Sequence, residues 1–393
     1  MKPSKYNHLL RRRGRAPLLY NSRNHRTLEL DPVQHAIYNG LMIPITRNLM
    51  NPKDPAMDHF LTLLRAEQMA VEEHYDELPE VQLQSNLMRF DQRRLSLWLQ
   101  LTTRCQAGCA GCPYEGNRAD MGAAARQRLL DLIASRAPLL RDLRLSLWGG
   151  DPLLAWPAWQ SLEKEIGGLA KQHGFTFSYQ VVANAVPRGF DQSALRSCSR
   201  LLLNDPSFAA APSLAVTYLT DFKRVAERHG TFGANAAVRF IANQPSARLC
   251  RNINGLCQSV PDHTDEEYDI IRRLALEGCA VANLPRPKIC ACEAVDPQAF
   301  IMDVNGAIFK CWNDVGVPAA DCTAVLNDPM APQLFRWLAW NPFRQQHCRM
   351  CNILPWCQGG CTAKPPNEDC GHWRYALREL LKLVVISKEK RGE

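Results

Sequence analysis

The sequence CQAGCAGC, at residues 105–112, places Cys105, Cys109 and Cys112 at the spacing Cys-x3-Cys-x2-Cys. Three thiolates this close together can hold one [4Fe–4S] cluster and leave one of its four irons without a protein ligand. An iron left open in this way can bind a substrate or a cofactor, which a fully ligated electron carrier cannot do. The glycines between the cysteines let the loop curl around a cluster. The stretch therefore predicts an iron–sulfur site that binds a further ligand.

Strands and helices alternate along the chain around this stretch. Leu95, Leu97 and Leu99 alternate with other residues as in a strand, and the cysteines follow directly. Further strands are predicted at 143–148, 175–183, 238–242 and 280–283, and helices at 123–135, 159–173, 213–229 and 265–278. This alternation predicts an α/β fold with a parallel sheet or barrel. Ligands of such folds bind at the C-terminal ends of the strands, which is where the cysteines fall.

Two further polar features follow predicted strands. The turn Gly149-Gly150-Asp151-Pro152 comes after the strand at 143–148, and Asn184 comes after the strand at 175–183. The carbonyl groups of a glycine turn can accept hydrogen bonds from an ammonium group. Together with the cysteines, these features resemble the radical SAM superfamily, whose corresponding turn reads Gly-Gly-Glu-Pro.

The resemblance covers about residues 94–288 and implies a partial (β/α)6 barrel. It implies that the open iron binds S-adenosylmethionine, whose reductive cleavage yields a 5′-deoxyadenosyl radical. It also implies that Gly149, Gly150 and Asp151 bind the methionine part and that Asn184 binds the ribose. Gly111 is a departure, because the family usually has an aromatic residue before the third cysteine. The alternative is a structural zinc site, which would need a fourth Cys or His close by in the sequence.

A second cysteine array lies near the C-terminus. It reads Cys292-x13-Gly306-x4-Cys311, then Cys348-x2-Cys351-x5-Cys357-x3-Cys361, then Cys370. This spacing resembles the SPASM extension of radical SAM enzymes, expected here over residues 289–393. The resemblance implies two auxiliary [4Fe–4S] clusters, and so three clusters in the whole chain. The implied ligands are Cys290, Cys292, Cys311 and Cys361 for one auxiliary cluster, and Cys348, Cys351, Cys357 and Cys370 for the other.

Alternatives remain for parts of this array. Cys279 is an alternative ligand in place of Cys290 or Cys292, and zinc ribbons also use Cys-x2-Cys pairs. The chain has sixteen cysteines, which disulfides would explain poorly in a reducing compartment. Asn305-Gly306 predicts the tight turn of a hairpin over 300–310, which would deliver Cys311 to its cluster.

The first segment, residues 1–93, is expected to form a separate small module. Short strands are predicted at 17–21 and 27–30, and Asp31-Pro32 and Asp54-Pro55 each predict the start of a helix. The spacing over 60–75 also suits a helix. The segment resembles the winged-helix-like module with which peptide maturases capture a leader peptide by strand addition. The alternative is a structural cap on the barrel.

Composition places the chain among ordinary globular proteins, with 46% hydrophobic and 22% charged residues out of 393. No apolar run is long enough to span a bilayer, and the N-terminus lacks the apolar core of a secretory signal. We therefore expect a cytoplasmic protein with no membrane partner. The net charge is +8, with a basic run at 11–15 that we expect to be a solvated terminus rather than a nucleic-acid site.

These features together predict a peptide maturase that abstracts hydrogen from a precursor peptide with a leader and closes a C–C or thioether cross-link. Its electrons would come from a reductant such as flavodoxin or ferredoxin. A sulfatase-maturing enzyme is the second hypothesis. That family has an Asp base directly after the cysteine of Gly-x4-Cys, where this chain has Trp312, with Asp314 two residues further on. An iron–sulfur electron-transfer or sensor protein is the third hypothesis, and the sequence identifies no catalytic residue.

Overall fold

The structure, a computed structural model, describes residues 1–12, 14–106, 112, 114, 116–204, 214–220, 237–240, 265–277, 279, 287–288, 290–363 and 370–391. The chain forms two compact units. The first comprises Met1–Met88, Asn283–Ala291 and Asn341–Val385, and the second Arg89–Ala282, Cys292–Trp340 and Ile386–Glu393. The N-terminal segment thus shares a unit with much of the second cysteine array. The three segments expected from the sequence stay a prediction.

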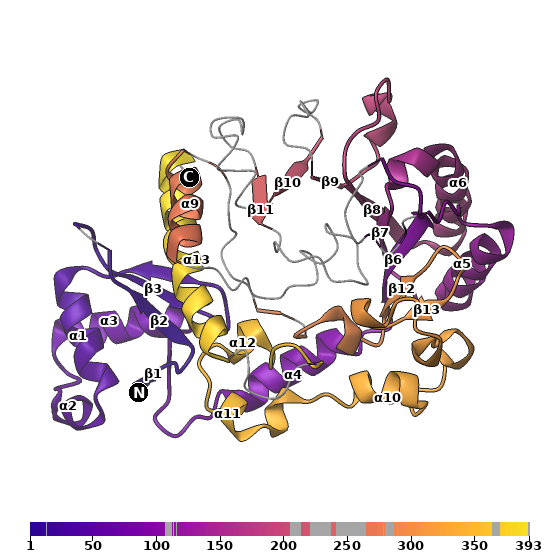
Figure 1. Ribbon diagram of the computed structural model, residues 1–393. Helices are drawn as coiled ribbons and strands as arrows, with labels where there is room; N and C mark the ends of the chain where they lie inside the picture. Colours follow the sequence, from indigo (N-terminus) through magenta and orange to yellow (C-terminus); the bar gives the residue numbers. More distant parts are fainter. Residues whose placement is uncertain are drawn as a thin grey trace. The chain divides into compact units, whose positions relative to one another are not determined.

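An eight-stranded sheet forms the centre of the second unit (Figure 1). Its strands, in chain order, are β6 (Arg94–Thr102), β7 (Asp142–Gly149), β8 (Thr176–Ala183), β9 (Arg200–Leu203), β10 (Val216–Thr220), β11 (Ala237–Phe240), β12 (Ala299–Met302) and β13 (Ile308–Phe309). The strands β6 to β11 run parallel, each beside its neighbour in the chain. β12 joins β6 in parallel, and β13 pairs with β12 as a hairpin. The α/β fold with a parallel sheet is therefore confirmed, and within β6 to β11 the strand order follows the chain without the reversal found in doubly wound sheets.

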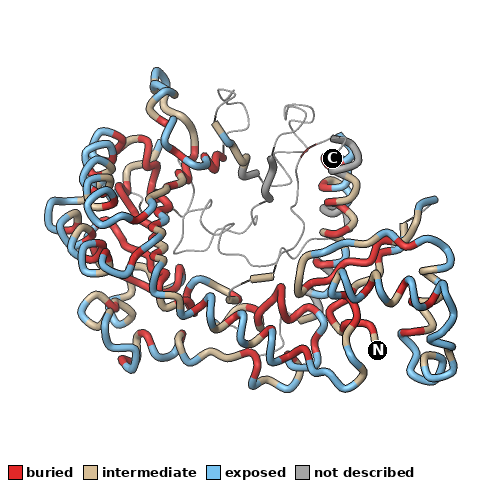
Figure 2. Tube along the Cα trace, turned by 180° about the vertical axis from the view of Figure 1, so that it is seen from behind, coloured by how far each residue is buried: buried red, intermediate tan, exposed pale blue. Residues whose placement is uncertain are grey.

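The sequence pattern of β6 explains why this strand lies in the middle of the core. Leu95, Leu97 and Leu99 are buried on one face and pack in the same cluster as the apolar residues of α5 (Ala123–Arg136) and α6 (Trp156–His173). Trp98 faces the other way and packs in a second cluster, with Trp148 of β7. Parallel strands buried on both faces need such apolar residues at consecutive positions. Figure 2 shows buried residues concentrated along these strands, with exposed residues on the outer sides of the helices.

The remaining elements of the second unit are short, apart from one helix. They are η1 (Pro152–Ala155), η2 (Gln192–Leu195), α9 (Asp265–Leu276), η3 (Glu293–Val295), η4 (Trp312–Asp314), η5 (Pro318–Ala320), η6 (Thr323–Val325) and α10 (Pro332–Leu338). The expected hairpin over 300–310 is confirmed, and Gly306 in its turn has a φ of 83°. That left-handed conformation suits glycine, as the Asn-Gly signal predicts.

The first unit contains a three-stranded antiparallel sheet in the order β2-β3-β4 and a separate pair of β1 with β5. Its elements are β1 (Lys2–Pro3), β2 (Asn7–Leu10), β3 (Leu18–Asn21), β4 (Thr27–Glu29), α1 (Pro32–Met42), α2 (Pro44–Leu49), α3 (Pro55–Ala66), β5 (Ala70–Val71), α4 (Leu78–Arg89) up to Met88, η7 (Pro342–Arg344), α11 (Gln346–Arg349), α12 (Leu354–Cys357) and α13 (Cys370–Arg391) up to Val385. Asp31 and Asp54 cap α1 and α3 as expected. None of the described helices is long and apolar enough to cross a membrane.

Two expectations about helices are wrong. α3 ends at Ala66 instead of continuing to residue 75, because Gln68 adopts a φ of 55° and the chain turns into β5. Residues 216–220, expected inside a helix, form strand β10, where pairing with β9 and β11 overrides the helical spacing. The expected strand at 280–283 lies outside the described residues.

Arg89 joins two loops of the second unit to the start of its sheet. The side chain is only 6% exposed and donates to the carbonyl oxygens of Val295 (2.7 Å), Trp340 (2.7 Å) and Leu338 (2.8 Å). A planar guanidinium can serve several acceptors at once, and buried carbonyl groups need such donors. Arg89 therefore holds the segment that follows Cys292 against the segment that precedes residue 341.

We expect Arg89→Met to lower the free energy of unfolding by roughly 3 kcal/mol, because several buried carbonyl groups lose a charged donor. Denaturant unfolding followed by circular dichroism would measure the loss. Arg93→Met is the matched control, since Arg93 pairs with Asp91 at the surface and its loss should leave the midpoint unchanged. Equal losses in the two variants would contradict this role of Arg89.

Candidate functional site

The cysteine loop and the glycine turn meet at the ends of β6 and β7. The backbone N–H of Gly150 donates to the carbonyl oxygen of Thr102 at 2.8 Å. The next N–H, of Asp151, donates to the carbonyl oxygen of Arg104 at 2.7 Å. Arg104 directly precedes Cys105. The turn that follows β7 is therefore bound to the base of the cysteine loop by two main-chain hydrogen bonds.

This approach is so close that both turn positions require glycine. A Cβ atom on Gly149 would lie 2.2 Å from the carbonyl oxygen of Thr102, and one on Gly150 would lie 2.1 Å from that of Arg104. Gly149 also has a φ of 145°, which other residues rarely adopt. The sequence alone suggested carbonyl groups for an ammonium ligand. The structure adds a packing reason for the same two residues.

Asp151 connects this turn to the end of β8. Its side chain is fully buried and accepts hydrogen bonds from the backbone N–H groups of Leu153 (3.2 Å), Asn184 (3.2 Å) and Ala185 (3.3 Å). Burial raises the pKa of Asp151 to about 6, and the three N–H donors oppose that rise. The carboxyl group therefore serves as a hydrogen-bond acceptor that holds the ends of β7 and β8 together.

Asn184 contacts both motifs at once. Its Nδ2 donates to Cys105 Sγ at 3.0 Å and to the carbonyl oxygen of Gly150 at 3.1 Å. Its Oδ1 accepts from Nδ2 of Asn204 at 2.8 Å. The structure therefore brings together Cys105, Gly150, Asp151 and Asn184, as expected for residues at the ends of adjacent parallel strands. The expected ribose contact of Asn184 stays a prediction.

Asn204 is a site residue that the sequence analysis missed. It follows β9 directly, as Asn184 follows β8. The signal was an Asn at the end of an apolar run, Leu201 to Leu203. That run is short enough that it was not recognised as a strand.

The cysteine loop itself is described only in part. Cys105 and Cys112 are partly exposed thiols, while Cys109 lies outside the described residues. Arg104 fixes the start of the loop, donating to Asp120 Oδ1 at 2.8 Å and to the carbonyl oxygen of Leu154 at 2.9 Å. Thiols are the donor set that iron–sulfur clusters require, so these residues fit such a group.

Four cysteines of the C-terminal array gather in the first unit. Burial, followed by repulsion from the neighbouring thiols of Cys357, Cys370 and Cys351, raises the pKa of Cys348 to about 12. Burial likewise raises the pKa of Cys357 to about 12. Bound iron would instead keep such thiols deprotonated, and thiols are the donor type that iron–sulfur clusters require.

The other predicted ligands are divided between the two units. Cys292 and Cys311 pack with Ala294 and Trp337 in the second unit, whereas Cys290 and Cys361 belong to the first. Within the described part of the chain, no three Cys, His, Asp or Glu side chains are arranged to hold a metal ion. The three ligand sets therefore stay predictions, as does an exchange with Cys279.

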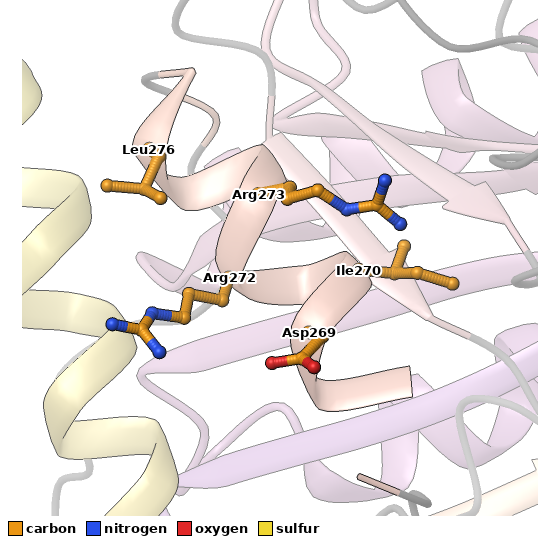
Figure 3. Close-up of a pocket in the computed structure, with 5 residues that line it drawn as sticks. All are labelled: Asp269, Ile270, Arg272, Arg273 and Leu276. Carbon is orange, nitrogen blue, oxygen red and sulfur yellow. The ribbon is translucent and has the colours of Figure 1, made fainter. Parts of the chain in front are cut away.

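Helix α9 lines a hollow of about 550 Å³ elsewhere in the second unit. All of its described lining residues come from this one helix, and Figure 3 shows Arg272 and Arg273 pointing to opposite sides of it. A binding site needs polar groups that converge. The described residues of this hollow do not provide such a set.

The chain matches no protein-family model and no curated protein sequence. Among solved structures, it is similar to SuiB of Streptococcus suis bound to S-adenosylmethionine, at 14% identity and a TM-score of 0.40, over 92% of this chain and 95% of SuiB. It is also similar to anSMEcpe with bound AdoMet and Kp18Cys peptide, at 12% identity and a TM-score of 0.46, over 75% of this chain and 99% of that one. BtrN in an open conformation is a third, at 11% identity and a TM-score of 0.35, over 73% and 96%. Two of these three solved structures hold bound S-adenosylmethionine.

We expect Gly150→Ala to lower the free energy of unfolding by roughly 3 kcal/mol, because the new methyl group would collide with two backbone carbonyl oxygens. Thermal unfolding monitored by calorimetry would measure the change. The control is Gly168→Ala in α6, where a Cβ atom meets nothing within 4 Å and a helix gains up to about 1 kcal/mol from alanine. Unchanged stability of Gly150→Ala would mean that the close approach is not required.

Proposed function

We propose that this chain is a radical SAM peptide maturase with three [4Fe–4S] clusters. The observation that carries the proposal is the direct bonding of Cys105, Gly150, Asp151 and Asn184 at the C-terminal ends of three adjacent parallel strands. Ligand sites of parallel α/β folds lie at this edge. A partial barrel is the form of the sheet that we infer, because the six parallel strands β6 to β11 follow chain order.

In this proposal Cys105, Cys109 and Cys112 hold the first cluster, and Gly149, Gly150, Asp151 and Asn184 hold S-adenosylmethionine beside it. When bound there, the cluster and S-adenosylmethionine would supply the radical chemistry that removes a hydrogen atom from the peptide. The carboxylate of Asp151 accepts hydrogen bonds from backbone N–H groups and so fixes the turn, which would keep the Gly149 and Gly150 main chain in place for the methionine part. The cysteines at 348, 351, 357 and 370 would hold an auxiliary cluster, which would accept the surplus electron.

The N-terminal sheet is the proposed binding place of the leader peptide. Among the described residues β4 pairs only with β3, so its other edge has unpaired backbone groups. At the opposite side of the sheet, His8 of β2 and Ser22 contact the carbonyl oxygen of Asn352. An open strand edge is what strand addition by a peptide requires, which favours β4. The SPASM arrangement and the winged-helix character of this module are part of the proposal.

The environment of Trp312 disfavours the sulfatase-maturing alternative. Trp312 stands where that family has its Asp base, and its ring packs edge-on against Trp98 and Trp148, each at 5.0 Å between centroids. Asp314, the nearest carboxylate in sequence, is paired with Arg336. A proton acceptor is therefore not placed at that position.

The test is anaerobic incubation of the reconstituted protein with a candidate precursor peptide, S-adenosylmethionine and dithionite. We expect about twelve irons per chain, release of 5′-deoxyadenosine, and a peptide product that has lost two hydrogens by mass spectrometry. About eight irons with stoichiometric zinc would contradict the cluster assignment. Clusters without 5′-deoxyadenosine would instead favour an electron-transfer protein.

Two variants separate the clusters in this test. Cys105→Ala should abolish release of 5′-deoxyadenosine, because it removes a ligand of the cluster that binds S-adenosylmethionine. Cys348→Ala should keep that release and lose the peptide product, because only the auxiliary cluster loses a ligand. The reverse pattern would exchange the roles of the two sites.

A further inference from the structure

The side-chain amide of Asn184 is fully oriented by its neighbours. The carbonyl oxygen of Gly150 can only accept a hydrogen bond, so the group facing it at 3.1 Å must be Nδ2. The same nitrogen then presents its second hydrogen to Cys105 Sγ at 3.0 Å. Asn184 is 7% exposed, so water competes little for either contact.

Asn204 fixes the amide from its other end. Its Nδ2 donates to Asn184 Oδ1 at 2.8 Å, and its side chain is also buried, at 6% exposure. If the Asn184 amide turned over, two donors would face each other here and two acceptors would face each other at Gly150. Both arrangements are unfavourable in a buried place. The N–H···S contact is therefore built into the fold by two asparagines on neighbouring strands.

We propose that Asn184, oriented by Asn204, is a positioning residue that raises the reduction potential of the cluster held by Cys105. This inference rests on the proposed function, since it needs that cluster. Reduction adds one electron to the cluster and so increases the negative charge on its sulfur ligands. A donor aimed at Cys105 Sγ stabilises the reduced form more than the oxidised form, and hydrogen bonds to ligand sulfurs are among the factors that set such potentials.

The arrangement leaves room for the expected ribose contact. Oδ1 of Asn184 has two lone pairs and accepts one described hydrogen bond, from Asn204. A ribose hydroxyl group could therefore donate to the same oxygen without breaking the contact to Cys105. Asn184 would then link the sulfur ligand of the cluster to the bound cofactor.

The experiment is a redox titration of the reconstituted full chain with dithionite, followed by electron paramagnetic resonance of the first cluster. Asn184→Leu removes the donor and should shift the equilibrium about tenfold toward the oxidised cluster, which is about 59 mV for a one-electron couple. Asn204→Asp changes no residue that contacts Cys105. It replaces the amide that donates to Asn184 Oδ1 with a carboxylate oxygen, which can only accept. The Asn184 amide should then reverse, which would also lower the potential.

Two controls separate this effect from others. The auxiliary cluster of the first unit, read in the same titration, should keep its potential in every variant. Asn117→Asp adds a charge near the loop, at a residue whose Oδ1 accepts only from Thr103 among the described residues, and should shift the equilibrium less than twofold.

The outcomes are distinguishable. Wild-type protein that assembles no cluster at Cys105, or releases no 5′-deoxyadenosine, would overturn the proposed function itself. Suppose instead that the wild-type protein releases 5′-deoxyadenosine while both variants change the equilibrium between the oxidised and the reduced first cluster by less than twofold. That result would overturn only the role of Asn184. If Asn184→Leu fails to assemble the first cluster, Asn204→Asp decides, and an unchanged potential in it counts against the proposal.

Discussion

The site depends on two main-chain hydrogen bonds, from Gly150 N–H to the Thr102 carbonyl and from Asp151 N–H to the Arg104 carbonyl. They bring the turn after β7 so close to the base of the cysteine loop that no side chain fits between them. The cysteine loop therefore begins from a fixed point at Arg104, even though small residues such as Ala107 and Gly108 follow in the sequence. A ligand held by Cys105 would lie near the Gly149–Gly150 backbone for the same reason.

The buried polar groups at this edge form a chain of hydrogen bonds, in which each contact positions the group that makes the next one. Asp151 is placed in the interior by its own backbone contact, and its carboxylate must then find donors, which the N–H groups after β8 provide. Those contacts position Asn184, whose amide reaches Cys105, Gly150 and Asn204. Burial raises the pKa of Asp151 because these donors offset the loss of hydration only in part. The ends of β7, β8 and β9 are in this way joined by side chains as well as by the sheet.

The sequence predicted the elements whose signals are local and strong. Alternating leucines predicted β6, and Asp-Pro pairs predicted the starts of α1 and α3. The end of α3 was not predictable from spacing, since the left-handed φ of Gln68 depends on the pairing of β5 with β1. Asn204 was missed because the preceding strand is short and is specified by its neighbours in the sheet. The glycine turn was recognised by its motif, but its steric reason needed the atoms of Thr102 and Arg104.

The packing of Trp312 is the observation that best distinguishes peptide cross-linking from the sulfatase-maturing reaction. Its ring fills the space between Trp98 and Trp148, and Trp98 in turn donates from its indole nitrogen to the carboxylate of Glu293. An aspartate at position 312 would place a charge inside this apolar cluster, where it would be costly without a partner. A reaction that needs a base beside Cys311 is therefore poorly suited to this packing. In the reaction proposed above, a radical that couples to a nearby side chain and passes an electron to an auxiliary cluster would need no base at this position.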